Sequence, residues 1–453
     1  MQSCLSKDYT YLVFGLARIG VATSKFFEKH GYNFYATDDN TDAIKQLEVD
    51  EKHKIYDYSN IMQDVDFVVL SQGVHVQNHP HKIVELAKKN GVELISDVDI
   101  FYNYIQTRAD KNDKKIIAIT GTNGKSTTTA LTAHILNKTG HKAIACGNIG
   151  LAVLADEVDI DKYDFFVVEI SSTNLHLTGH TTFDCGCLLN ITEDHIEYHG
   201  SMESYAAAKE KCVSCSKIAV LCVDDDYTKT IADRNNNVVL VSKNDILENG
   251  FSWTDDTFYA NKTKIEQTKF QNLLGVHNVE NILCSCAVCA QFGVDFRAAL
   301  QAAKTFTTLH HRMEFVREID GIKFINDSKA TNADSTQKAL RALAENEIYL
   351  IAGGKRKTAG LLALKDDLRA VKCVFLIGEA VESFAEELKK LNKKFVKCGT
   401  MENAVKTAFE EAKKRNSEKN KIVLLSPVCA SFDQYSCFEE RGEDFCKIVN
   451  ELI

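Results

Sequence analysis

The sequence predicts an α/β protein of three domains, and three observations lead to that prediction. Short apolar runs alternate with amphipathic helical patterns from end to end, which is typical of βαβ units and parallel sheets. The chain has 453 residues, too many for one hydrophobic core. A polar stretch at 107–115 separates the first unit from the next strand. We expect domains at 1–110, 111–308 and 309–453, the first and last of them Rossmann-like.

Composition limits the class of partner. Hydrophobic residues make up 45% and charged residues 26%, as in ordinary globular proteins. The formal net charge of −9 argues against a nucleic-acid partner, which requires clustered basic charge. No long apolar run or basic leader segment occurs, so we expect no membrane partner and a cytoplasmic location. We further expect a monomer that acts on small molecules.

Fifteen cysteines are scattered through apolar runs such as ILCSCAVCA at 282–290. This pattern favours reduced thiols over disulfides. The pairs Cys212/Cys215 and Cys286/Cys289 have zinc-like spacing, but the second lies in an apolar helical segment where cysteine acts as a small hydrophobe. A zinc site is therefore the less favoured alternative.

The first unit begins with a predicted strand, YLVFG at 11–15, followed by a helix to about residue 29. A second strand, NFYAT at 33–37, ends in Asp38. Glycines after the first strand and acids after the second are typical of dinucleotide-type folds, which present N–H groups to a phosphate and a carboxylate to a ribose. The spacing between Gly15 and Gly20 is not G-x-G-x-x-G, so a plain tight turn stays open.

The segment IIAITGTNGKSTTTALTAHIL at 116–136 has the order of a phosphate loop: buried strand, glycine-containing loop, helix. Lys125 supplies a positive charge, and Ser126 is suited to Mg²⁺. Ile119 stands where the common form of the motif has glycine. A purely structural turn does not explain Lys125 and Ser126 directly after two glycines. We expect a central P-loop ATPase-type domain that binds ATP through Gly121, Thr122, Asn123, Gly124, Lys125, Ser126 and Thr127.

Two later strands end in polar residues. YDFFVVEISS at 163–172 delivers Glu169, and CGCLLNITEDH at 185–195 delivers Asn190 and His195. Because ligands collect at the carboxyl edge of a parallel sheet, we expect these residues near the phosphate loop. Mg²⁺ prefers oxygen ligands, so Ser126 and Glu169 are candidates for one metal and His195 for a second. Taken alone, each could be an exposed acid or a hydrogen-bonded histidine.

These segments resemble the Mur ligase family, the ATP-dependent amide-forming enzymes of peptidoglycan precursor synthesis. The matching motifs occur in the family's order. They are TGTNGKST (120–127), GNIG (147–150), VVEISS (167–172), NITEDH (190–195), AAAK (206–209), GVHNVEN (275–281), HRMEFV (311–316) and INDSKATN (325–332). The C-terminal segments AGGKRK (352–357) and LLSPVCASFDQYSCFEERG (424–442) are similar to the D-glutamate-adding branch, and the D-N-P-R signature of the diaminopimelate-adding branch is absent.

The resemblance implies a role for individual residues. It implies two Mg²⁺ sites, the first held by Ser126 and Glu169 and the second by His195 and Lys209, with Lys125, His195 and Lys209 as catalytic residues. Further nucleotide contacts would come from Asn278, Arg312 and Asp327. The UDP-sugar substrate would contact Leu16, Ala17, Asp38, Ser71, Gly73, Asn148 and Ser171. The D-glutamate pocket would contain Thr331, Lys357, Ser431 and Phe438.

Some of these assignments depend on the resemblance alone. Without it, the favoured interpretation is that Phe438 is a core residue and that Lys355, Arg356 and Lys357 form a solvated basic turn. The sequence also departs from the D-glutamate-adding branch. TNLH at 173–176 replaces a Phe-Gln-Leu-type run, and Ser71-Gln72-Gly73 replaces Ser-Pro-Gly. Both departures bear on the UDP-sugar contacts.

Lys209 lies in a predicted capped helix at 201–211. A free ammonium beside divalent cations would be repelled. The resemblance implies that CO₂ carbamylates Lys209, which gives it a carboxylate-like group, whereas Lys211 is expected to be a solvated side chain.

The resemblance implies an enzyme that adds D-glutamate to UDP-N-acetylmuramoyl-L-alanine through an acyl phosphate. Two alternatives stay open. One is a ligase that adds a different amino acid to the same kind of precursor. The other is a non-catalytic nucleotide-sensing or scaffold protein, against which Lys125, Glu169, His195 and Lys209 argue.

Overall fold

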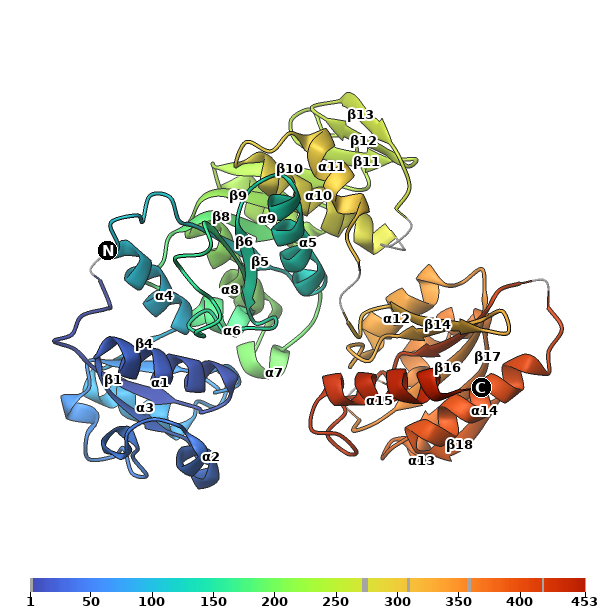
Figure 1. The fold of residues 1–453 in the computed structure, drawn as a ribbon, viewed down its shortest axis with the longest axis horizontal. Coiled ribbons are helices and arrows are strands. Elements are labelled where there is room, and N and C mark those ends of the chain that lie inside the picture. The colour runs from blue at the N-terminus through green and yellow to red at the C-terminus, as the bar shows by residue number, and fades with distance from the viewer. Residues whose placement is uncertain (1–2, 271–275, 308–309, 357–359, 418, 453) are drawn as a thin grey trace. The chain divides into compact units, whose positions relative to one another are not determined.

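The computed structural model describes residues 3–270, 276–307, 310–356, 360–417 and 419–452. The chain forms two compact units. The first runs to Phe270 and resumes at Asn278–Phe306, and the second begins at Thr307. The described strands form three sheets of four, nine and six strands, and parallel strands alternate with helices in each (Figure 1). The predicted α/β class is therefore confirmed.

The first sheet is wholly parallel, with the order β2-β1-β3-β4. Its strands are β1 (Thr10–Phe14), β2 (Asn33–Thr37), β3 (Phe67–Leu70) and β4 (Glu93–Ile95). The helices that connect or follow them are α1 (Arg18–His30), α2 (Thr41–Gln46), α3 (Lys82–Asn90) and α4 (Asp97–Gln106). The predicted strands at 11–15 and 33–37 agree with β1 and β2. Helix α1 begins at Arg18, so Gly20 is part of the helix and not of the loop that precedes it. A Cβ on Gly20 would lie 1.9 Å from the Gly15 carbonyl oxygen, so glycine lets the helix pack on the loop.

The second sheet has the order β13-β12-β11-β10-β9-β8-β5-β7-β6. Its parallel part contains β5 (Lys115–Thr120), β6 (Ala143–Gly147), β7 (Phe165–Glu169), β8 (Phe183–Leu188), β9 (Ser216–Cys222), β10 (Val238–Ser242) and β11 (Phe251–Thr254). Strands β12 (Thr257–Ala260) and β13 (Thr263–Gln267) continue it antiparallel. The apolar runs predicted as strands are the neighbouring strands β8, β5 and β7 of this sheet.

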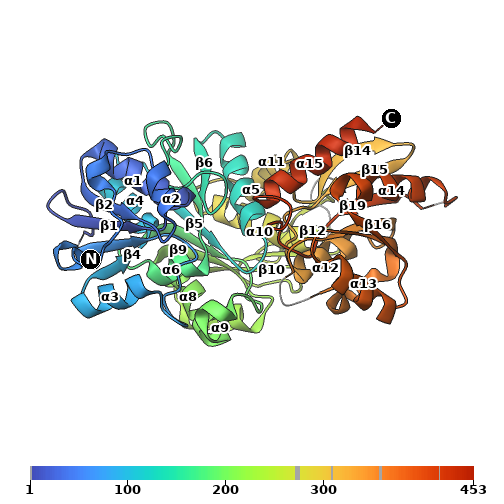
Figure 2. The same ribbon diagram turned by 90° about the horizontal axis from the view of Figure 1, so that it is seen from below.

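Helices cover this sheet, as Figure 2 shows from a second direction. They are α5 (Lys125–Lys138), α6 (Ser172–Leu177), α7 (Ile196–His199), α8 (Met202–Ser214), α9 (Asp226–Arg234), α10 (Val276–Ala290) and α11 (Phe296–Lys304). Helix α8 confirms the predicted capped helix, since the Ser201 side chain accepts a hydrogen bond from the Ser204 N–H.

The third sheet, in the second unit, has the order β14-β15-β19-β16-β17-β18 and is parallel except for the β14–β15 pair. Its strands are β14 (Glu314–Ile319), β15 (Ile322–Asn326), β16 (Glu347–Gly353), β17 (Val371–Ile377), β18 (Phe395–Gly399) and β19 (Lys421–Leu425). The helices are α12 (Ala333–Ala342), α13 (Val381–Lys390), α14 (Met401–Lys413) and α15 (Phe438–Glu451). Separate apolar clusters line its two faces, as expected for a sheet covered on both sides.

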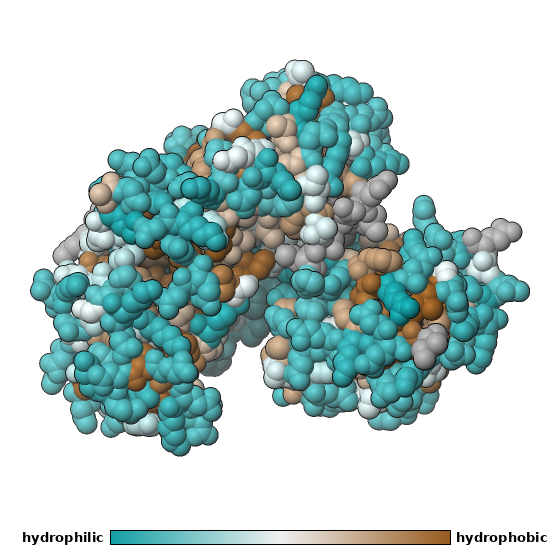
Figure 3. All heavy atoms as spheres, viewed as in Figure 1, coloured by the Kyte–Doolittle hydropathy of each residue, from teal (hydrophilic) through white to brown (hydrophobic). Residues whose placement is uncertain are grey.

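The surface and the cysteines agree with the composition. Hydrophilic residues cover most of the face drawn in Figure 3. All fifteen cysteines are free thiols, and eleven of them are buried. In the part of the chain that the structure describes, no helix has the length and apolar character needed to cross a membrane.

Gly186 on β8 lets helix α8 pack directly on the sheet. A Cβ at this position would lie 2.0 Å from the carbonyl oxygen of Cys212. That contact is to backbone, so the helix itself would have to move. The glycine therefore sets the position of α8, which carries Lys209.

We expect Gly186→Ala to lower the free energy of unfolding by about 3 kcal/mol, because an extra methyl group in a packed contact forces the helix away from the sheet. Denaturant unfolding of the full chain measures this change. Gly179→Ala is the matched control, since the nearest atom to a Cβ there is 4.0 Å away. Equal stabilities of the two variants would contradict the assignment.

Candidate functional site

The phosphate loop joins β5 to α5 in a conformation that requires its glycines. Gly124 precedes the helix with a φ of +84°, and a Cβ there would lie 2.2 Å from the Asn281 side-chain oxygen. Lys125 is the first residue of α5, and its ammonium donates to the carbonyl oxygens of Gly121 and Thr122, both at 2.8 Å. Ser126 is buried one residue later. The loop thus places a lysine, a hydroxyl group and a helix N-terminus together, which suits a phosphate group.

The carboxyl ends of β5, β7 and β8 lie at one level. In the parallel register Glu169 stands beside Ile119 on one side and Gly147 on the other, and Thr120 pairs with Leu188. The predicted meeting of these strand ends at one edge of the sheet is confirmed. Glu169 is 6% exposed, and its Oε2 atom has no hydrogen-bond partner among the described residues. A buried carboxylate oxygen of this kind fits a metal ligand.

Lys209 points into the protein at the same place. It is 1% exposed, and its ammonium donates to the Gly121 carbonyl oxygen at 2.8 Å and lies 4.8 Å from the Tyr205 ring centroid. Burial, together with the charge of Lys125, holds the pKa of Lys209 well below its ordinary value. Asp194 and Glu169 act in the opposite direction. The structure thus brings Lys125, Glu169 and Lys209 within electrostatic reach of one another.

Lys211 differs from its expected role. Its ammonium donates to the carbonyl oxygens of His176 and Thr178, at 2.7 and 3.0 Å. It is therefore not a solvated side chain, because the last carbonyl groups of α6 face it and bind it. Lys209, two residues earlier, contacts the phosphate loop instead.

His195 lies at the exposed side of this region. It precedes α7 with a φ of +54°, and its side chain is 54% exposed. Its Nε2 atom lies 3.6 Å from Asp194 Oδ2, and its Nδ1 atom lies 3.9 Å from Glu197 Oε1. A non-glycine residue in this backbone region stores strain, which is common at functional sites. The side chain is accessible to a ligand and has carboxylates beside it.

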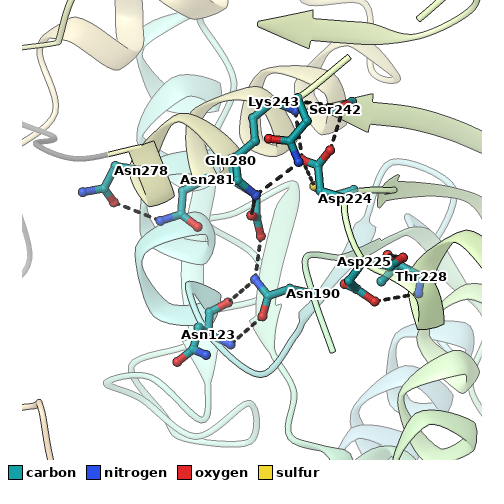
Figure 4. Close-up of polar contacts among 12 residues, drawn as sticks. Asn123, Asn190, Asp224, Asp225, Thr228, Ser242, Lys243, Asn278, Glu280 and Asn281 are labelled. Atoms are coloured by element: carbon teal, nitrogen blue, oxygen red, sulfur yellow. Dashed lines mark hydrogen bonds and ion pairs between the residues drawn. The ribbon is translucent and has the colours of Figure 1, made fainter. Parts of the chain in front are cut away.

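The Asn190 side chain is hydrogen-bonded to the backbone of the phosphate loop, as Figure 4 shows. Its side-chain oxygen accepts from the Asn123 N–H at 2.9 Å, and its amide nitrogen donates to the Asn123 carbonyl oxygen at 3.2 Å. The same nitrogen donates to Glu280 on α10 at 2.5 Å. The loop is therefore fixed by an amide that a buried carboxylate orients.

Glu280 belongs to a buried charge cluster with Asp224 and Lys243. Ligand atoms of Cys222, Asp224 and Glu280 lie within 4.8 Å of one another, a spacing that a metal ion could use. The Lys243 ammonium, however, lies 2.5 Å from Glu280 and 3.4 Å from Asp224 (Figure 4). Burial alone would lower the pKa of Lys243, but these carboxylates outweigh it and the pKa is raised. Lys243 is thus the cation of this cluster.

A cavity of about 460 Å³ lies at the carboxyl ends of the strands of the first sheet. Four of the seven candidate UDP-sugar residues line it: Ala17, Asp38, Ser71 and Gly73. A fifth, Leu16, is buried, and its N–H donates to Asp38 at 2.6 Å. Gln72, one of the departures from the related ligases, also lines the cavity.

The other two candidates in this set do not line the cavity. Asn148 follows β6, and its N–H donates to the Glu169 carbonyl oxygen at 2.9 Å. Ser171 caps α6 by accepting from the Asn174 N–H at 3.2 Å. Asn174, in the departing TNLH segment, donates to the buried Asp97 at 3.1 Å. The side-chain amide of Asn174 is thus hydrogen-bonded to another residue of the protein.

In the second unit, Asp327 follows β15. It is 7% exposed and accepts from the Ser426 hydroxyl at 2.9 Å and the Met313 N–H at 3.3 Å. Burial raises the pKa of Asp327 to about 7, which the charge of Arg312 partly offsets. The two nucleotide candidates of this unit are therefore electrostatic neighbours.

The candidate D-glutamate residues lie on three loops of the second unit. Thr331 is half-buried, Ser431 is buried, and Phe438 begins α15 and lies 3.8 Å, centroid to ammonium, from Lys329. Phe438 is half-buried and is not a core residue. Lys357 lies outside the described residues. Arg356 forms a 2.5 Å ion pair with Glu387, so it is not part of a merely solvated turn.

Arg441 joins these loops and was not identified from the sequence. Its guanidinium is 1% exposed and donates to the carbonyl oxygens of Ser328 and Cys429, at 2.8 and 3.1 Å. It also donates to the Ser328 hydroxyl at 3.0 Å, and that hydroxyl donates to the Phe438 carbonyl oxygen. Burial lowers the pKa of Arg441 to about 10. Glu280, Lys243 and the cavity residue His81 were also missed. Lys243 and His81 lie in no quoted motif, and Glu280 lies within GVHNVEN, where the motif gives it no role.

Comparisons with known proteins show the family to which this chain belongs. The Mur ligase middle domain matches residues 119–289, and the Mur ligase, glutamate ligase domain matches residues 311–429. Proteins named UDP-N-acetylmuramoylalanine–D-glutamate ligase match over nearly the whole chain. The one from Wolbachia pipientis is 35% identical, covering 100% of this chain and 98% of the relative. The one from Rickettsia prowazekii is 36% identical, covering 96% of each.

Solved structures share the fold. The UDP-N-acetylmuramate–alanine ligase MurC of Thermotoga maritima matches with a TM-score of 0.61 at 18% identity, covering 98% of this chain and 99% of that one. The MurF ligase of the same organism, solved in complex with ADP, matches with a TM-score of 0.57 at 20% identity, covering 85% and 95%. The chain belongs to the Mur ligase family, in the group formed by the UDP-N-acetylmuramoylalanine–D-glutamate ligases.

Proposed function

We propose that this protein adds D-glutamate to UDP-N-acetylmuramoyl-L-alanine at the expense of ATP, in peptidoglycan precursor synthesis. The observation that carries the proposal is the meeting of Lys125, Glu169 and Lys209 at one sheet edge, beside a phosphate loop. Full-length relatives bear the name of this activity. The division into domains at 110/111 and 308/309, the monomeric state and the cytoplasmic location stay predictions.

The reaction has two steps. In the first, the γ-phosphoryl group of ATP passes to the terminal alanine carboxylate, which gives ADP and an acyl phosphate. In the second, the D-glutamate amine attacks the acyl carbon, a proton leaves the nitrogen, and inorganic phosphate departs from the tetrahedral intermediate. An amide bond replaces the acyl–phosphate bond. Lys125 and the loop N–H groups hold the phosphates while charge shifts among their oxygens.

The oxygen-rich edge of the sheet fits Mg²⁺. Ser126 and Glu169 would hold one ion, and Glu169 Oε2 is a buried oxygen without a hydrogen-bond partner among the described residues. His195 and Lys209 would hold a second. Bound Mg²⁺ neutralises charge on the phosphate and acyl oxygens.

Lys209 would act in this site as its carbamate. The ammonium first releases one proton. The uncharged amine then attacks the carbon of CO₂, a C–N bond forms as one C–O π bond opens, and the nitrogen releases a second proton, so that a cation becomes an anion. Deep burial beside Lys125 favours the uncharged amine. The product would supply a carboxylate-like oxygen where a free ammonium would repel metal ions.

Substrate contacts follow the candidate residues. The cavity lined by Ala17, Asp38, Ser71 and Gly73 would hold the nucleotide part of the UDP-sugar, with Leu16, Asn148 and Ser171 as further contacts. Asn278, Arg312 and Asp327 would complete the ATP site. Thr331, Lys357, Ser431 and Phe438 would orient D-glutamate, since hydroxyl and ammonium groups suit an acceptor with two carboxylates.

A decisive test is phosphate release by the purified full chain with ATP, Mg²⁺ and UDP-N-acetylmuramoyl-L-alanine. We expect release that depends on D-glutamate and is absent with L-glutamate or diaminopimelate. Release with another amino acid instead would assign a different ligase of the same class. ATP binding without turnover for any acceptor would favour the scaffold alternative.

Lys209→Ala should lose at least about a hundredfold in turnover, because a ligand of the second metal is removed. Short carboxylates such as acetate or propionate should restore part of the activity, as they replace the missing oxygen ligand. Initial rates with and without the carboxylate measure both effects. Lys217→Ala is the control, since Lys217 is exposed and pairs with Asp184. Full activity of Lys209→Ala would refute the role.

A further inference from the structure

The orientation of the Asn190 side chain is decided by a residue that does not touch the phosphate loop. Its amide must present oxygen to the Asn123 N–H and nitrogen to the Asn123 carbonyl oxygen. Glu280 accepts the second amide hydrogen at 2.5 Å. A reversed amide would place oxygen against a carboxylate and an N–H₂ group against an N–H, so Glu280 enforces the productive orientation (Figure 4).

Lys243 in turn holds Glu280 in place. The ammonium lies 2.5 Å from Glu280 Oε2, and both side chains are mostly buried, at 19% and 8% exposed. The second carboxylate, Asp224, is held by the Ser242 hydroxyl at 2.7 Å and the Lys243 N–H at 2.9 Å. Without the lysine, two buried carboxylates would face each other with no cation between them, which is unfavourable.

Helix α10 contacts the loop at a second point. The Asn281 side-chain oxygen accepts from the Thr128 hydroxyl at 3.1 Å and lies against Gly124. Adjacent residues of one helix therefore support both sides of the loop, Asn281 directly and Glu280 through Asn190. A displacement of Glu280 would therefore change the position of Asn123, because Asn190 is hydrogen-bonded to both residues.

We propose that the Glu280–Lys243 ion pair is a positioning device for the phosphate loop: it orients Asn190 and so sets the affinity for ATP without touching the nucleotide. This inference rests on the proposed function, which assigns ATP to this loop. Neither residue is a catalytic residue. Their effect reaches the phosphates through the backbone of residue 123.

The test compares single variants of the full chain by the dissociation constant of Mg-ATP from calorimetry, together with kcat, the KM for ATP and the melting temperature. Lys243→Met and Glu280→Gln should each weaken ATP binding about tenfold. Lys243→Met leaves two buried carboxylates without the cation between them, and Glu280→Gln replaces a group that only accepts hydrogen bonds with an amide that can also present N–H₂ to Asn190. The KM for ATP should rise by a similar factor with a smaller change in kcat. Lys243→Arg retains the cation and should bind ATP within about threefold of the wild type.

Lys304→Met is the matched control. Lys304 pairs with Glu266 at the same 2.5 Å, between α11 and β13, and among the described residues it forms no hydrogen bond or ion pair with the phosphate loop. It should lower the melting temperature without changing ATP affinity.

Two results would overturn the inference. The first is ATP affinity of Lys243→Met and Glu280→Gln equal to that of Lys304→Met. The second is Lys243→Arg binding as weakly as Lys243→Met, which would show that the cation is not what matters. If Lys243→Met does not fold, Glu280→Gln against Lys243→Arg decides the question alone. Wild-type protein that binds no ATP would instead overturn the proposed function.

Discussion

The in-register pairing of β5 with β7 and β8 is the constraint on which the candidate active site depends. It sets Thr120, Glu169 and Leu188 at one level, so that the segments that follow each strand emerge at one edge. The phosphate loop, the turn after Glu169 and the NITEDH segment are then neighbours although they are far apart in sequence. Thr122 and Thr192, for example, are joined by a hydrogen bond and are 70 residues apart. Because the strands are parallel, their carboxyl ends and the polar residues that follow them lie at the same edge, which is where ligands bind in such sheets.

Buried charged side chains lie at this edge of the sheet. Lys209 and Glu169 are almost fully buried, and Glu169 keeps one oxygen without a hydrogen bond among the described residues. Such groups destabilise a fold unless they are paired or bound by a ligand. The nearby Glu280–Lys243–Asp224 cluster shows the other solution, with a cation held between two carboxylates. One cluster is complete by itself, whereas the other has the composition of a ligand site.

A similar division of labour occurs in the second unit. Thr331, Ser431 and Phe438 are the described candidates for substrate contacts, and the buried Arg441 links the Ser328, Cys429 and Phe438 segments. Side chains that would touch a substrate are thus supported by buried polar side chains that would not. In both units the supporting group is charged, so its hydrogen bonds are strong and directional.

The sequence by itself determined the α/β class, the strand–loop–helix order of the phosphate loop, and most candidate residues, because these depend on local periodicity and on residues close together in the chain. Glu169 and Asn190 were found in this way, as polar residues at strand ends. Only the tertiary structure decided the burial of Lys209, the inward contacts of Lys211, and the link from Asn123 through Asn190 to Glu280, which spans 90 residues between its last two members. The roles of Glu280, Lys243 and Arg441 could not be predicted, although Glu280 and Arg441 lie within quoted motifs, because strand order and helix packing determine their partners and these are long-range properties of the fold.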